Sequence, residues 1–84
     1  MPKIEIYYKD TCPFCARAMA LLESKQVEFI KIDLLAYPEK RDEMIKRTNG
    51  KTSVPEIFID DQLIGGCDDL FALENENKLD ALLK

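Results

Sequence analysis

Two cysteines separated by two residues, Cys12 and Cys15, are the side chains of this sequence best suited to covalent chemistry. They follow an alternating, strand-like run over residues 3–8 and lead into a run with helical spacing. A Cys-x-x-Cys pair at a strand-to-helix junction is typical of a dithiol site for oxidation and reduction. Pro13 suits the first helical position, because its missing N–H would have no partner within the helix. The pattern therefore predicts that Cys12 is the N-cap of a helix.

The two sulfurs should have different roles because their surroundings differ. At an N-cap, Cys12 faces free backbone N–H groups and the positive end of the helix dipole, which both favour a thiolate. Cys15 lies on one face of the predicted helix with Ala18, Met19 and Leu22, where burial favours a neutral, inaccessible thiol. We therefore expect Cys12 to be the attacking nucleophile and Cys15 to be the resolving thiol.

The size and charge of the chain exclude several classes of function. Its 84 residues predict one domain over residues 1–84 with a single modest core. A net charge of −4 argues against nucleic-acid binding and against attraction to anionic membranes. No apolar run approaches the roughly 20 residues of a membrane span, and Lys3, Glu5 and Lys9 interrupt any signal-peptide core. We expect a cytoplasmic monomer.

A zinc site is the metal-binding alternative for the cysteines. Cys12, Cys15 and Cys67 supply three ligands and the chain has no histidine, whereas a structural zinc ion takes four ligands. An aspartate or an external thiol would have to complete the set, so we expect no bound metal. We interpret Cys67 as a packing residue; a regulatory thiol open to oxidation is the alternative.

The remaining pattern predicts an α/β fold with the element order β-α-β-α-β-β-α. The expected elements are a strand over 3–8, a helix from 13 to about 25, a strand over 27–33, a helix from 38 to about 48, strands over 56–60 and 62–65, a helix that begins at Asp68 or Asp69, and a last short helix capped by Asn77. The first two strands should be parallel across a helical crossover. Apolar residues on both sides of 27–33 predict a strand covered on both faces. Asp60-Asp61 predicts a tight turn between antiparallel strands.

This order resembles that of the glutaredoxins when it is read with three motifs. They are Cys-Pro-Phe-Cys at 12–15, Ser-Val-Pro at 53–55 and Gly-Gly-Cys-Asp-Asp at 65–69. The resemblance covers residues 4–83 and is greatest to the small bacterial glutaredoxin-3 type. It implies a thioredoxin-like fold, with a four-stranded mixed sheet flanked by helices. It also implies thiol–disulfide exchange with glutathione as electron donor, and a cis peptide bond before Pro55.

The resemblance further implies a glutathione site. The bend at Pro55 would present the backbone N–H and C=O of Val54 beside Cys12, where they could pair with an extended peptide. Two cations would bind the glycine carboxylate, and the start of the third helix would bind the γ-glutamyl carboxylate through backbone N–H groups. An acidic side chain, Asp68 or Asp69, would bind the ammonium. The implied glutathione-binding residues are Lys9, Phe14, Arg41, Ser53, Val54, Pro55, Gly66, Cys67 and Asp68.

Four features of the sequence depart from the family's usual pattern. Phe14 replaces the usual tyrosine, and Ser53 replaces the usual threonine while it keeps a hydroxyl. Glu56 stands where glutamine or arginine is common, and the segment 48–52 is one residue longer than usual. None of these changes removes a group that the reaction requires.

The predicted activity is reduction of protein–glutathione mixed disulfides and of protein disulfides, with glutathione reductase acting indirectly through glutathione. Two alternatives stay open. A redoxin recharged by thioredoxin reductase would lack the glutathione-binding groups, which Lys9, Arg41 and Asp68 argue against. A carrier of an iron–sulfur cluster, held by two chains and two glutathiones through Cys12, is more typical of single-cysteine relatives.

Overall fold

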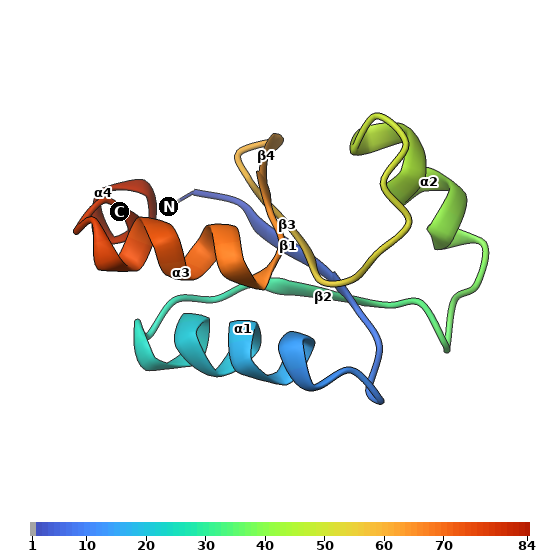
Figure 1. Ribbon diagram of the computed structural model, residues 1–84, viewed down its shortest axis with the longest axis horizontal. Coiled ribbons are helices and arrows are strands. Elements are labelled where there is room, and N and C mark those ends of the chain that lie inside the picture. Colours follow the sequence, from blue (N-terminus) through green and yellow to red (C-terminus); the bar gives the residue numbers. More distant parts are fainter. Residues whose placement is uncertain (1) are drawn as a thin grey trace.

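Four strands form one mixed sheet in the order β2-β1-β3-β4, with helices on both faces (Figure 1). The strands are β1 (Ile4–Tyr8), β2 (Ile30–Asp33), β3 (Glu56–Ile59) and β4 (Gln62–Gly65). β1 pairs in parallel with β2 and antiparallel with β3, which pairs antiparallel with β4. The computed structural model describes residues 2–84. The predicted fold class and element order are confirmed.

Each face of the sheet carries its own apolar core. The first core lies under α1 (Pro13–Ser24), α3 (Cys67–Asn75) and α4 (Leu79–Leu82), and α1 and α3 lie side by side (Figure 1). The second lies under α2 (Lys40–Arg47), which supplies Met44. The first core contains Ile4, Ile6, Ala18, Leu22, Ile57, Ile59, Cys67, Leu70, Leu79 and Leu83, and the second contains Tyr7, Leu34, Met44 and Phe58. Alternation along β1 and β3 sends successive side chains to opposite cores.

The second strand is shorter and more exposed than predicted. β2 begins at Ile30 because its pairing with β1 begins there, opposite Glu5. The strand lies at the edge of the sheet, and the Ile30 side chain is 51% exposed, so the prediction of a strand covered on both faces is wrong. Val27 and Phe29 precede the strand and pack against the first core.

Several helix boundaries also differ from the prediction. α2 begins at Lys40, because Pro38 lies in the turn that precedes it. There the carbonyl of Pro38 accepts the N–H of Arg41. α3 begins at Cys67 with Gly66 as its N-cap. Asn77 is not the N-cap of α4: its φ of 60° is left-handed, a conformation that asparagine tolerates. Lys78 is the N-cap of α4 instead. No helix within residues 2–84 is long and apolar enough to cross a membrane.

The turn between β3 and β4 and the start of α3 depend on unusual backbone conformations. Asp60 and Asp61 have φ values of 50° and 65°, which confirms the predicted tight turn. Gly65 has a φ of 119°, and a Cβ at this position would collide with the carboxylate of Asp69. That carboxylate accepts the backbone N–H of Gly66 at 3.1 Å. Glycine at 65 therefore allows Asp69 to close the first turn of α3.

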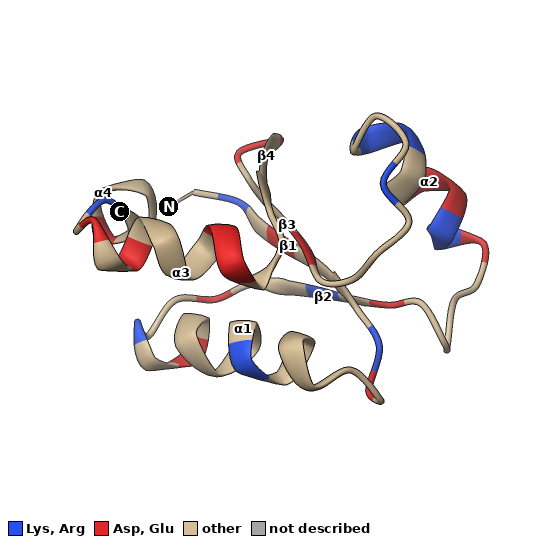
Figure 2. Cartoon of the chain, in the orientation of Figure 1, with Lys and Arg blue, Asp and Glu red and all other residues tan. Residues whose placement is uncertain are grey.

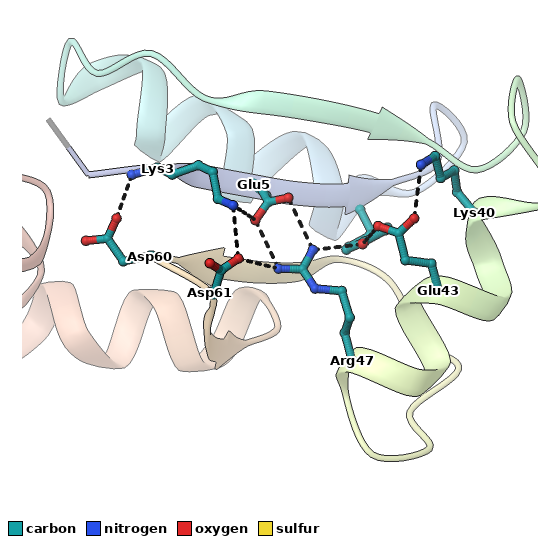
Figure 3. A network of polar contacts seen from close by, with 8 residues as sticks. Lys3, Glu5, Lys40, Glu43, Arg47, Asp60 and Asp61 are labelled. Carbon is teal, nitrogen blue, oxygen red and sulfur yellow. Dashed lines mark hydrogen bonds and ion pairs between the residues drawn. The ribbon is translucent and has the colours of Figure 1, made fainter.

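Polar contacts attach α2 to the sheet, as Figure 3 shows. The guanidinium of Arg47 binds both carboxylate oxygens of Glu5, at 3.0 and 3.2 Å, and donates to the hydroxyl of Tyr7 at 2.9 Å. It also lies 3.9 Å from the ring centroid of Phe58. The hydroxyl of Tyr7 donates to Glu43 at 2.6 Å. Burial is the larger cause, and this hydrogen bond the next, of the raised pKa of Tyr7, which is about 12. The network also includes Lys3, Lys40 and Asp61.

Replacing Arg47 tests how strongly this network holds α2. Arg47→Met should lower the free energy of unfolding by about 1–3 kcal/mol, because it leaves the half-buried Glu5 and the buried Tyr7 without this donor. The measurement is urea unfolding followed by circular dichroism. Lys46→Met, on the exposed side of the same helix, is the control and should change stability by less than about 0.5 kcal/mol. Equal losses in the two variants would contradict a specific role for Arg47.

Candidate active site

Cys12 is the N-cap of α1, as the sequence predicts. Its backbone is extended, with φ −99° and ψ 112°, and Pro13 occupies the first helical turn. The Cys12 Sγ accepts the backbone N–H of Cys15 at 3.3 Å. This N–H would otherwise lack a partner within the helix, and it stabilises negative charge on the sulfur. Cys12 is half-buried, so its sulfur can meet a substrate.

Cys15 lies beside Cys12 but has no exposed surface. Burial, followed by the hydrogen bond and the charge of Cys12, raises the pKa of Cys15 to about 12. A backbone hydrogen bond at Lys9 opposes this effect. At neutral pH the site therefore presents one accessible sulfur and one protonated sulfur next to it.

The segment before β3 meets Cys12 from the other side. The peptide bond between Val54 and Pro55 is cis, as the resemblance implied. The thiol of Cys12 donates to the carbonyl oxygen of Val54 at 3.7 Å. Residues 42 positions apart in the chain are thus brought together at the sulfur. An extended ligand disulfide-bonded to Cys12 would meet the backbone of Val54 directly.

A cavity of about 500 Å³ opens next to this junction. It lies between Phe14, the loop before β3 and the first turn of α3. Figure 2 shows acidic residues at this first turn of α3. Of the predicted site residues, the cavity is lined by Phe14, Ser53, Val54, Pro55, Gly66, Cys67 and Asp68.

Lys9 and Arg41 do not line the cavity. The backbone carbonyl of Lys9 accepts the N–H of Cys12 at 3.1 Å, so this residue shapes the approach to α1. Arg41 is exposed in the first turn of α2. The structure thus brings together most of the predicted binding residues, and the predicted roles of Lys9 and Arg41 stay predictions.

The cavity also contains residues that the sequence analysis did not assign to it. They are Gly50, Lys51, Thr52, Glu56 and Asp69. Lys51 is an exposed cation next to the Ser-Val-Pro motif, and its proximity to that motif is the signal that could have identified it. Both acids of the first turn of α3, Asp68 and Asp69, are exposed, and one oxygen of Asp69 accepts the N–H of Gly66.

Glu56 is a buried carboxylate at the floor of this region. It is 2% exposed, and its Oε2 accepts the hydroxyl of Ser53 at 3.2 Å. Its Oε1 has no hydrogen-bond partner among residues 2–84. Burial raises the pKa of Glu56, and the negative charge of Asp69 adds to this effect, whereas Ser53 and Lys51 oppose it.

Cys67 belongs to the first core. Its side chain is 5% exposed, and burial raises the pKa of its thiol. This placement agrees with the interpretation of Cys67 as a packing residue. Within residues 2–84, no group of three or more His, Cys, Asp or Glu side chains is arranged to hold a metal ion.

Alkylation should distinguish the three cysteines by their surroundings. Iodoacetamide at pH 8 should modify Cys12 in the native protein and leave Cys15 and Cys67 intact, because the thiolate is the reactive form and both buried thiols have raised pKa values. Peptide mapping by mass spectrometry measures the modification. In urea all three should react. Modification of native Cys15 at the rate of Cys12 would contradict the assignment of an inaccessible resolving thiol.

Comparison with known proteins places this geometry in context. A model of the glutaredoxin family matches residues 4–64. The sequence is 57% identical over 84 residues to glutaredoxin 3 of Escherichia coli (strain K12), with all of both chains covered. The solution structure of a glutaredoxin from Brucella melitensis has a TM-score of 0.84 and 54% identity, over 100% of this chain and 90% of that one.

A second solved structure extends the likeness. The solution structure of a dithiolic glutaredoxin from Trypanosoma brucei brucei has a TM-score of 0.88 and 35% identity, over 99% of this chain and 88% of that one. The likeness thus holds in both sequence and backbone over nearly the full length. The chain belongs to the glutaredoxin family, as its three motifs indicated.

Proposed function

We propose that this chain is a glutathione-dependent dithiol oxidoreductase that reduces protein–glutathione mixed disulfides and protein disulfides. The observation that carries the proposal is the pair of unlike sulfurs at the start of α1. Cys12 is half-buried and accepts the N–H of Cys15, whose own sulfur is buried and protonated. Such an asymmetric pair suits a reaction in which one sulfur attacks and the other waits.

Reduction of a mixed disulfide requires only Cys12. Its thiolate attacks the glutathione sulfur, so a Cys12–glutathione disulfide forms while the original disulfide breaks and the protein leaves as a thiolate that takes a proton from water. A second glutathione thiolate then attacks the bound glutathione sulfur. Glutathione disulfide leaves, and Cys12 returns as a thiolate stabilised by the N–H of Cys15. Glutathione reductase would regenerate the glutathione.

Reduction of a protein disulfide also requires Cys15. Cys12 first attacks one sulfur of the substrate disulfide, so that a mixed disulfide forms and the other substrate sulfur leaves as a thiolate. Cys15 then loses its proton to water and attacks the Cys12 sulfur, so that a Cys12–Cys15 disulfide forms and the second substrate sulfur leaves. Two glutathione thiols reduce this disulfide and leave as glutathione disulfide. Before the first step, Cys12 contributes to the raised pKa of Cys15 through its hydrogen bond and its charge. Disulfide formation at Cys12 removes that contribution and lowers the pKa of Cys15. Burial, the larger cause of the raised pKa of Cys15, remains, so this change favours the resolving step without fully activating the thiol.

Glutathione would lie in the cavity beside Cys12. The Val54 backbone suits its peptide groups, and the backbone N–H groups of Cys67 and Asp68 suit the γ-glutamyl carboxylate at the start of α3. Asp68 would bind the ammonium. Lys9, Arg41 and the newly assigned Lys51 are the cations available for the glycine carboxylate. We propose a monomer that works in a reducing cytoplasm, with glutathionylated or disulfide-bonded proteins as substrates.

Cysteine variants test the two proposed roles. Cys12→Ser should reduce turnover of a small glutathione mixed disulfide to the uncatalysed rate, because no nucleophile remains. Cys15→Ser should keep most of this turnover but lose reduction of protein disulfides. The assay couples the reaction to glutathione reductase and NADPH. Equal loss in both variants would contradict the assignment of roles.

The electron donor is tested with the wild-type protein. Turnover with glutathione and glutathione reductase supports the proposal, because glutathione is then the electron donor for which the cavity supplies binding groups. Absence of turnover with glutathione, together with reduction by thioredoxin reductase, would instead show a redoxin of the thioredoxin-dependent kind. In that case Lys9, Arg41 and Lys51 would be ordinary surface charges.

Lys51→Gln tests the cation found at the cavity. It should raise the KM for the glutathione mixed disulfide by about two- to fivefold and leave kcat nearly unchanged, because an exposed ion pair contributes at most about 1 kcal/mol of binding energy. Lys46→Gln makes the same change on α2, outside the cavity lining, and is the control. An equal effect of both variants would indicate long-range charge rather than contact.

A further inference from the structure

Glu56 is the one acidic residue of the cavity lining that is buried and that the proposed reaction does not use. It follows the cis bond at Pro55 and lies at the first position of β3. Ser53, three residues earlier, is exposed and lines the same cavity. The two side chains are joined by a hydrogen bond of 3.2 Å. Glu56 can therefore act on a ligand through Ser53 without touching it.

The hydrogen bond fixes the direction of the Ser53 hydroxyl. An ionised carboxylate only accepts hydrogen bonds, and a serine hydroxyl has one hydrogen to donate. The other oxygen of Glu56 has no partner among residues 2–84, so Ser53 is the only side-chain donor that the carboxylate has in this part of the chain. Because an unsatisfied buried carboxylate is costly, the hydrogen of Ser53 is committed to Glu56. Toward the cavity, the Ser53 oxygen can then only accept.

The charges around the cavity favour the same kind of ligand group. Glu56, Asp68 and Asp69 line it, against the single cation Lys51. Asp68 and Asp69 are both exposed, but an oxygen of Asp69 already accepts the backbone N–H of Gly66 at the start of α3. An accepting hydroxyl and an exposed carboxylate that line one cavity suit a positively charged donor. In a γ-glutamyl peptide that donor is the ammonium group.

We propose that Glu56 is a positioning residue that holds the Ser53 hydroxyl as a hydrogen-bond acceptor and so makes the cavity select ligands with a free amino group. This inference rests on the proposed function, since the selected ligand is the glutathione part of the substrate. Glutamine at 56 would weaken the selection and leave the part that comes from Asp68, because the glutamine amide can either donate to Ser53 or accept from it. The hydroxyl hydrogen would then be free to turn toward the ligand.

Two mixed-disulfide substrates test the proposal. One carries glutathione, and the other carries glutaryl-cysteinyl-glycine, in which hydrogen replaces the amino group. Wild-type protein should prefer the first in kcat/KM. Glu56→Gln should reduce that preference by about three- to tenfold, through loss of activity on the glutathione substrate alone. Glu28→Gln changes the same charge at an exposed position outside this cavity and should leave both substrates unaffected.

Variants of Ser53 test the same proposal independently. Ser53→Ala, at an exposed position where folding should be retained, should reduce the preference as Glu56→Gln does, and the double variant should lose no more than either single one. Ser53→Thr, which keeps the hydroxyl, should preserve the preference. Thermal unfolding of each variant confirms that the fold is intact.

Several results would overturn the inference. Equal losses on both substrates in Glu56→Gln would show a general structural role, and an unchanged preference in Ser53→Ala would show that its hydroxyl does not meet the amino group. Additive losses in the double variant would show that the two residues act separately. The proposed function fails in a different way, by absence of wild-type turnover on the glutathione substrate.

Discussion

The hydrogen bond from the backbone N–H of Cys15 to the sulfur of Cys12 is the contact on which the rest of the site depends. It forms because Pro13 starts α1 directly after Cys12, which leaves the first N–H groups of the helix without helical partners. The apolar side of α1, with Ala18 and Leu22, packs in the first core, and Cys15 on the same helix has no exposed surface. A single helix start thus gives one sulfur to solvent and the other to the interior.

The two faces of the sheet contribute to the site in different ways. On the α1 and α3 face, apolar packing holds the dithiol and the helix start that line the cavity. On the other face, α2 buries only Met44 and is attached through Arg47 and its polar partners (Figure 3). The cavity loop joins α2 to β3, so one of its ends is fixed by a strand and the other by this network. The two sides of the binding region therefore differ in what holds them.

Local features of the site could be predicted from the sequence, whereas features that depend on the sheet order could not. The cap at Cys12 follows from Pro13 and helical spacing alone. The exposure of Ile30 depends on β2 being an edge strand, which no pattern within the strand reveals. The burial of Glu56 likewise depends on the tertiary arrangement that places it in one cavity with the loop and the start of α3. A charged residue next to the Ser-Val-Pro motif is typically solvated, so its place at the cavity floor emerges only in three dimensions.

Gly65 makes the start of α3 sensitive to the smallest possible substitution. The space that a Cβ would occupy is filled by the Asp69 carboxylate, so even alanine would push that group away from the N–H of Gly66. The turn it closes forms one wall of the cavity. As the sequence drifts over evolutionary time, this position should therefore accept few residues other than glycine, although it carries no reactive group. The limit on which variants can keep the site is set here by the room for one methyl group.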